Sequence, residues 1–126
     1  MNTGKGLYIQ LFSIHGLLRS ENLELGRDAD TGGQIKYVVE LAKALDKHTG
    51  VQKVDVFTRL IVDNTVSDDY AQPIEKVSDA CSIVRIQCGG RKYMRKELLW
   101  PHLDEYIDKT IKYIKRQKHI PDIVHG

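Results

Sequence analysis

The chain has 126 residues, of which 41% are hydrophobic and 29% are charged. This composition is typical of one globular domain and not of a disordered segment. The formal net charge of +2 is too small to indicate a surface for nucleic acid or membrane, and no apolar run reaches the roughly 18 residues of a membrane helix. We therefore expect neither partner. The charge is uneven, because residues 91–126 hold nine basic and five acidic side chains.

The N-terminus and the cysteines predict a cytoplasmic protein. Residues 1–6 lack the long apolar stretch and the small-residue cleavage site of a signal peptide. Cys81 and Cys88 lie seven residues apart, on one predicted strand and the loop after it. This placement favours two free thiols in a reducing compartment over a disulfide.

Predicted strands and helices alternate along the chain. Residues 7–13 are apolar and aromatic enough for a first strand. Apolar residues then recur at helical spacing over about 32–48, and Gly50 ends that helix. Residues 54–59 and 82–87 predict the second and third strands.

The remaining segments are a polar excursion, a second long helix and a short last strand. The acidic segment 62–80 predicts a surface excursion with a short helix at most. Leu103, Ile107, Ile111 and Ile114 form an apolar stripe that predicts the second helix, with Pro101 in its first turn. Residues 122–124 predict the last strand.

This order predicts a three-layer, Rossmann-like α/β fold with a parallel sheet, as one domain over residues 1–126. Ligands of such sheets bind beyond the carboxyl ends of the strands. That rule points to the loops that begin near Ser13, Cys88 and Val124. The last strand has no helix after it, which leaves the sheet partly uncovered. We therefore expect a truncated part of a larger domain.

The densest cluster of polar residues and glycines is 24–34. Thr31 and Gln34 have the spacing of a capping box. Gly32 and Gly33 would then place two amides at a helix N-terminus, which favours an anion such as a sugar phosphate or a nucleotide diphosphate. The alternative is that Thr31 and Gln34 only cap the helix and that the glycines only relieve crowding.

Motifs for cofactors and metals are weak in this sequence. It contains no G-x-G-x-x-G fingerprint and no P-loop. Asp28-Ala29-Asp30 resembles the Asp-x-Asp metal site of some sugar transferases, but it offers a hard cation too few oxygen ligands. The same carboxylates could stabilise the dipole of the following helix. We expect neither a metal nor a cofactor.

Two histidines and a basic stretch lie at the predicted carboxyl ends of strands. His15 and His125 are each followed by glycine, which lets a ligand approach the backbone closely. Arg91 and Lys92 follow the third strand and could hold a phosphate. The alternatives are structural histidines and a solvated basic loop.

Several blocks of sequence resemble the start of the sucrose-phosphate synthase family. The most specific are Ser13-Ile14-His15-Gly16-Leu17 and the run over 21–34 that ends in Asp30-Thr31-Gly32-Gly33-Gln34, and further matches lie in 36–42, 54–59, 92–93, 96–102 and 121–126. The sucrose synthases share the Asp-Thr-Gly-Gly-Gln run. The segment 26–30, which contains Arg27 and leads into this run, resembles the enzymes with a phosphorylated acceptor more closely than it resembles the sucrose synthases.

The resemblance implies a retaining glycosyltransferase of the two-domain GT-B type. Such an enzyme transfers glucose from UDP-glucose to fructose 6-phosphate in sucrose biosynthesis, and the transfer needs no bound metal. The chain would be the N-terminal part of the acceptor-binding domain. The C-terminal UDP-sugar domain, absent here, would be its partner, so the resemblance implies no catalytic residue in this chain and no activity of the chain alone.

The resemblance also assigns residues. Gly33 and Gln34 would contact substrate, and Lys92 would bind the acceptor near its phosphate. His125 and Gly126 would open a loop with further acceptor contacts. Gly32, His15 and Arg91 remain additional candidates for substrate binding from their placement.

Three alternatives stay open at this point. One is a sucrose synthase, whose acceptor is fructose, and a second is another retaining GT-B transferase. The third belongs to a different class: a phosphate- or nucleotide-binding module without transferase activity.

Overall fold

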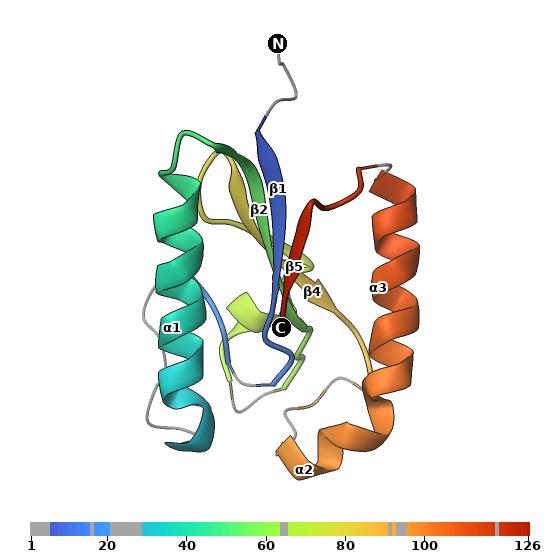
Figure 1. Cartoon of the computed structure of the whole chain (residues 1–126). Coiled ribbons are helices and arrows are strands. Elements are labelled where there is room, and N and C mark those ends of the chain that lie inside the picture. The colour runs from blue at the N-terminus through green and yellow to red at the C-terminus, as the bar shows by residue number, and fades with distance from the viewer. Residues whose placement is uncertain are drawn as a thin grey trace.

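A mostly parallel sheet forms the centre of the fold. The structure, a computed structural model, describes residues 6–15, 17–20, 29–63, 66–90, 92, 96–117 and 119–126, and for 29–34 and 96–97 it describes the backbone alone. In this part of the chain, the sheet has five strands in the order β3-β4-β2-β1-β5 (Figure 1). The strands are β1 (Leu7–Phe12), β2 (Val51–Arg59), β3 (Ile74–Lys76), β4 (Cys81–Ile86) and β5 (Ile123–His125). All neighbouring pairs are parallel except β3 and β4.

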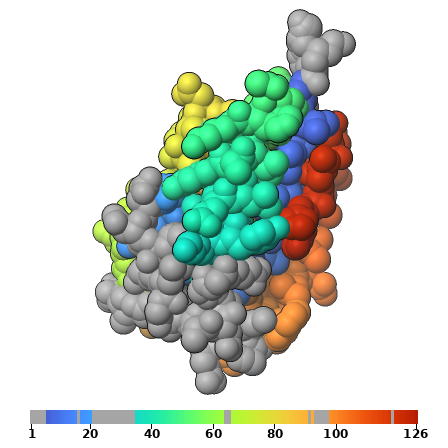
Figure 2. All heavy atoms as spheres, turned by 60° about the vertical axis from the view of Figure 1, so that its left-hand side comes forward, coloured from blue at the N-terminus to red at the C-terminus, as the bar shows by residue number. Residues whose placement is uncertain are grey.

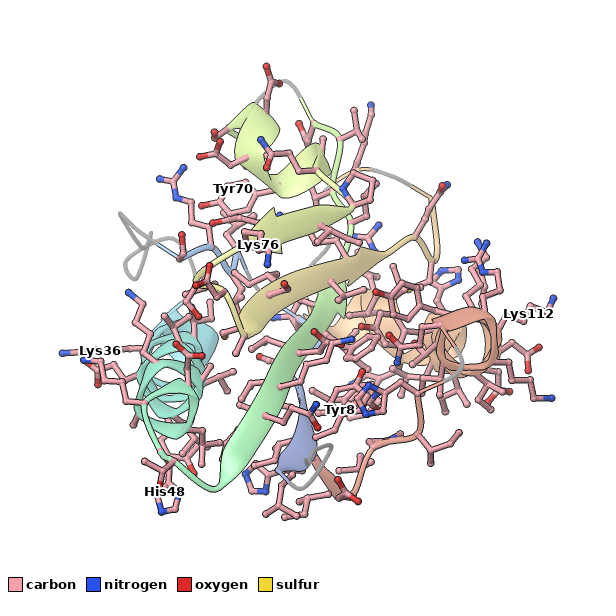
Figure 3. All side chains as sticks on the ribbon, turned by 90° about the horizontal axis from the view of Figure 1, so that it is seen from above. Tyr8, Lys36, His48, Tyr70, Lys76 and Lys112 are labelled. Carbon is pink, nitrogen blue, oxygen red and sulfur yellow. The ribbon has the colours of Figure 1, made fainter. Side chains whose placement is uncertain are left out.

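Two long helices cover opposite faces of this sheet. Helix α1 (Ala29–Asp46) lies on one face and α3 (Leu103–Gln117) on the other (Figures 1 and 3). Two short segments, α2 (Lys96–Leu99) and the 3-10 helix η2 (Trp100–His102), lead into α3. The predicted three-layer α/β architecture is thus confirmed.

The core consists of two main clusters, one on each face of the sheet. Alternate residues of a strand point to opposite faces, so β2 contributes Val54 and Val56 to the α1 side and Phe57 to the α3 side. The α1 side also buries apolar side chains of the helix itself, namely Ile35, Val38, Val39 and Ala42. The α3 side includes Val84, Ile86, Cys88, Leu99 and Tyr106.

Helix α1 begins one turn earlier than the sequence predicts. Its first residue is Ala29, so Thr31 lies in the first turn and not at the N-cap. The prediction of a capping box at Thr31 is therefore wrong. Alanine is a strong helix former and Asp30 favours the positive end of the helix dipole, which explains the earlier start.

The excursion between β2 and β4 is more ordered than predicted. It contains the 3-10 helix η1 (Asp68–Ala71), in which Tyr70 is buried, and the unpredicted strand β3. The Glu75 carboxylate of β3 accepts hydrogen bonds from the Ser20 amide and hydroxyl and from Arg85. Burial raises the pKa of Glu75, but these bonds outweigh burial and hold it below its usual value. A strand of three residues shows too little alternation to be recognised in a sequence.

Helix α3 buries a different face from the predicted isoleucine stripe. Its buried side chains are Tyr106 and Thr110, whereas Ile107 and Ile111 are 52% and 45% exposed. The Tyr106 hydroxyl donates a hydrogen bond to the Thr58 carbonyl at 2.9 Å, which directs the tyrosine face toward the sheet. The periodicity was correct for a helix and wrong for its orientation.

Both cysteines are free, as predicted, and both are buried. Burial raises the pKa of Cys81 to about 12, so this thiol stays protonated near neutral pH. Within the described part of the chain, no helix is long and apolar enough to cross a membrane.

A buried polar network joins β1, β2 and α3 (Figure 3 labels Tyr8). The Tyr8 hydroxyl donates to the Asp55 carboxylate at 2.6 Å and accepts from the side-chain amides of Gln10 and Gln117 at 3.0 and 2.8 Å. Lys53 lies 3.6 Å from the same carboxylate. Tyr8 and Asp55 are almost fully buried, so each polar atom of this network needs its partner.

We expect Tyr8→Phe to lower the free energy of unfolding by about 1 to 3 kcal/mol, because it removes three hydrogen bonds at a buried carboxylate and two amides. Urea unfolding followed by circular dichroism measures this change. Tyr113→Phe is the control, since no described residue accepts a hydrogen bond from that hydroxyl, and its effect should stay within about 0.5 kcal/mol. Equal effects of both substitutions would show that the network contributes nothing specific.

Candidate functional site

The predicted site residues converge on one edge of the sheet. Because β1, β2, β4 and β5 are parallel, their carboxyl ends lie at the same edge (Figure 1, lower side). His15 follows β1, Lys92 follows β4 and His125 is the last residue of β5. Helix α1 starts at this edge, because it runs against the direction of the strands (Figure 1). We call this region the carboxyl edge.

The loop after β1 is tied to the neighbouring strand. The Ser13 amide donates to the Phe57 carbonyl at 2.9 Å, which extends the β1–β2 pairing past the end of β1. The Thr58 hydroxyl donates to the Ile14 carbonyl at 3.5 Å. His15 follows directly and is half-buried. Its backbone therefore has a defined position beside the end of β2.

A small hollow lies between α1 and the ends of β1 and β5. Its volume is about 210 Å³, and its lining residues are Leu11, Phe12, Tyr37, Val38, Leu41, His125 and Gly126. Figure 2 shows the C-terminal residues (red) against the part of α1 that is drawn in cyan. His125 is exposed and paired in register with Leu11, so its position beside β1 is set by the sheet.

Tyr37 is a member of this site that the sequence analysis did not single out. It is 54% exposed and lines the hollow together with His125. Its position three residues after Gln34 in α1 was an available signal, because residues at this spacing share one face of a helix. An exposed tyrosine supplies both an apolar ring and a hydroxyl to a ligand.

The glycines before Tyr37 belong to the body of α1. The backbone of Gly32, Gly33 and Gln34 is helical, and the Gln34 side chain lies outside the described part. A helix that begins at Ala29 pairs the amides after its first turn, so its unpaired amides belong to residues up to Thr31. The positive end of the helix still faces the carboxyl edge. Arg91 also lies outside the described residues.

The turn before Lys92 is held by two charged side chains. Gly89 and Gly90 have φ values of 64° and 94°, which glycine adopts without strain. The Arg59 guanidinium donates to the Cys88 carbonyl at 2.8 Å and to the Gly90 carbonyl at 3.3 Å. The Gly89 amide donates to the Glu105 carboxylate at 2.8 Å. Lys92, two residues after the turn, is exposed.

The charges around this turn influence each other. Burial lowers the pKa of Arg59, while Cys88 and Glu105 act in the opposite direction. Hydrogen bonds from Lys109 and from the Gly89 amide lower the pKa of Glu105. Arg59 is protonated as arginines in proteins are, and the lowered pKa of Glu105 keeps its carboxyl ionised near neutral pH, so the turn lies between a cation and an anion.

A larger hollow of about 720 Å³ lies elsewhere, between α3 and the β3–β4 side of the sheet. Lys109, Lys112, Lys115 and Arg116 of α3 line it, over a floor that includes Val84, Ile86 and Tyr113. None of the predicted site residues that the structure describes lines this hollow. Four of the nine basic side chains of residues 91–126 therefore lie on α3, but this helix also carries three acidic ones, whereas residues 91–102 carry four basic and one acidic side chain.

Metal ligands are not gathered anywhere in the described part of the chain. No group of three His, Cys, Asp or Glu residues there could hold an ion. Asp28 and the side chain of Asp30 lie outside the described residues. The expectation of no metal thus stays a prediction.

Comparisons with known proteins agree on one family. A family model described as the first GT-B domain of sucrose synthase matches residues 5–126. Sucrose-phosphate synthase 4 of Arabidopsis thaliana is 50% identical over 121 residues, which cover 89% of this chain and 12% of that protein. The sucrose-phosphate synthase of Zea mays is 48% identical over 150 residues, which cover 99% of this chain and 14% of that protein.

A solved structure supports the same conclusion. A sucrose-phosphate synthase from Thermosynechococcus elongatus superposes with a TM-score of 0.62 at 28% identity, covering 86% of this chain and 24% of that one. The chain thus spans about one eighth of the length of the curated relatives that it matches. The family model covers nearly the whole chain, and the α/β sheet with its carboxyl edge is the fold of the matched structure. The chain therefore belongs to the family of the first GT-B domain of sucrose synthase.

Proposed function

We propose that this chain is part of a sucrose-phosphate synthase that transfers glucose from UDP-glucose to fructose 6-phosphate with retention of configuration. The similarity to sucrose-phosphate synthases over nearly the whole chain is the observation that carries the proposal. The chain would form the first part of the acceptor-binding domain. The rest of such an enzyme would supply the UDP-sugar domain.

The carboxyl edge would be the acceptor side of the substrate cleft. Lys92 would hold the phosphate of fructose 6-phosphate, because an exposed ammonium group is a point charge with three donors. Gly32, Gly33 and Gln34 would contact substrate at the start of α1, whose dipole favours an anionic group. Arg91 would add a second cation next to Lys92.

The hollow beside β5 would bind the sugar ring. Tyr37 and His125 line it from two different elements, and together they offer a hydroxyl, an imidazole and an aromatic face. His15 would approach from the end of β1. Gly126 would allow the backbone to come close to the ligand.

The chemistry itself would need the second domain. Transfer depends on two substrates held in a fixed relative geometry in a site that excludes water. This chain offers one side of such a site, so we propose that it is inactive alone and that the reaction needs no metal. Free, buried cysteines agree with a cytoplasmic location.

Sucrose synthase is the second candidate, because the matching family model carries its name. Its acceptor would be fructose, which has no phosphate for Lys92 to bind. The two candidates therefore differ in one chemical group at one position of the site.

We expect the full-length enzyme that carries this sequence to form product from UDP-glucose and fructose 6-phosphate, and to use fructose at least about 100 times less efficiently, as one lost charged contact implies. Release of UDP measures both rates. A preference for fructose would favour the sucrose synthase, and turnover by the 126-residue chain alone would disprove its inactivity.

Lys92→Ala in the full-length enzyme should raise the KM for fructose 6-phosphate by about 10- to 100-fold, because one charged hydrogen bond to phosphate is lost. The KM for UDP-glucose should change little. Lys112→Ala is the matched control, since Lys112 is also an exposed lysine but lies on α3. If Lys92→Ala left the KM for fructose 6-phosphate unchanged, Lys92 would not bind the acceptor.

A further inference from the structure

Arg59 is a buried cation at the carboxyl edge. It is the last residue of β2 and is only 3% exposed. Among the described residues, no carboxylate forms an ion pair with it, and its hydrogen bonds go to two backbone carbonyls of one turn. A buried guanidinium without a paired carboxylate costs folding free energy. Its position is therefore explained by the two carbonyls that it binds and not by an ion pair.

Arg85 provides the comparison within the same sheet. It lies next to the end of the neighbouring strand β4, is also 3% exposed and also binds two carbonyls, those of Leu18 and Gln72. Unlike Arg59, it forms an ion pair with Glu75 at 2.7 Å. Because Arg85 pairs in register with Thr58, it points to the opposite face from Arg59.

The turn that Arg59 binds lies two residues before Lys92. Arg59 fixes the carbonyls before and after Gly89, and Glu105 fixes the amide of Gly89 from the side of α3. The left-handed φ values of both glycines make this turn adaptable, because glycine can occupy several backbone conformations. Two charged hydrogen-bonding groups select one of these conformations. The direction in which the chain enters Lys92 depends on that selection.

We propose that Arg59 is a positioning residue for the anion-binding lysine, and that it acts with Glu105 by holding the Gly89-Gly90 turn. This inference rests on the proposed role of Lys92 in binding the acceptor phosphate. Arg59 itself is too buried to reach a substrate and acts through the turn.

One experiment tests the positioning without any substrate. In the full-length enzyme that carries this sequence, Arg59→Met should increase the hydrogen-exchange rate of the Gly89 amide by about tenfold or more, because the turn loses one of its two anchors. Amides of the core strands, such as Val56 and Ile83, should keep their protection. Tyr106→Phe is the matched control, because it removes a buried hydrogen bond to the carbonyl of Thr58 and none of the hydrogen bonds that hold the turn.

The second experiment measures how substitutions of Arg59 change the KM values for the two substrates. In the full-length enzyme, Arg59→Met should raise the KM for fructose 6-phosphate by about tenfold or more, as a displaced binding group does, with the KM for UDP-glucose within about threefold. Arg59→Lys should recover part of the loss, because it keeps the charge and one hydrogen bond. Tyr106→Phe should change neither KM.

These outcomes separate the inference from the function on which it rests. Unchanged exchange at Gly89 in both Arg59 variants, or equal KM changes for Arg59→Met and Tyr106→Phe, would overturn the positioning role. If Arg59→Met fails to fold, Glu105→Gln decides, because it weakens the other charged anchor of the turn, and a wild-type KM together with wild-type exchange in this variant would overturn the holding of the turn. If the wild-type enzyme does not use fructose 6-phosphate, the proposed function fails, while exchange at Gly89 still decides whether Arg59 holds the turn.

Discussion

Buried arginines at the ends of two neighbouring strands hold the loops of the carboxyl edge. In a parallel sheet the strands all end at the same edge. The backbone carbonyls of the loops that follow them need hydrogen-bond donors. Arg85 supplies them to the loop after β1 and to the excursion before β3, and Arg59 supplies them to the turn after β4. The site residues on these loops have defined positions because two forked side chains join segments that are far apart in the sequence.

The sequence predicted the architecture because its strongest signals are local. Apolar runs identified β1, β2 and β4, and helical spacing identified α1 and α3. Three features differ from what the sequence indicates, one for a local reason and two because of contacts between distant segments. Helix α1 starts earlier than predicted because Ala29 and Asp30 themselves favour a helix. Strand β3 is recognisable only by its pairing with β4. Helix α3 buries its tyrosine face because the Tyr106 hydroxyl donates a hydrogen bond to a carbonyl of β2.

From the sequence, the candidate site could be predicted only for those residues whose position follows from the end of a strand. His15, Lys92 and His125 lie at the expected edge because the parallel order requires it. Tyr37 and Arg59 were missed, since their roles depend on a hollow and a turn that no spacing reveals. Most of the charge surplus of the last third precedes α3, because residues 91–102 carry four basic and one acidic side chain and α3 carries four and three. The basic side chains of α3 nevertheless line a separate hollow, so the number of lysines and arginines alone does not identify the site.

The most direct test of this account is to determine which of the two hollows binds fructose 6-phosphate. Fructose 6-phosphate can be titrated into the ¹⁵N-labelled 126-residue chain, and NMR can follow the backbone amides, which detects even weak binding to one side of a cleft. We predict that the amide shifts change at the carboxyl edge, in the first turns of α1, around Gly89-Gly90 and Lys92, and at His125. Changes confined to α3 between Lys109 and Arg116, or no changes at all, would contradict the assignment of the carboxyl edge as the acceptor site.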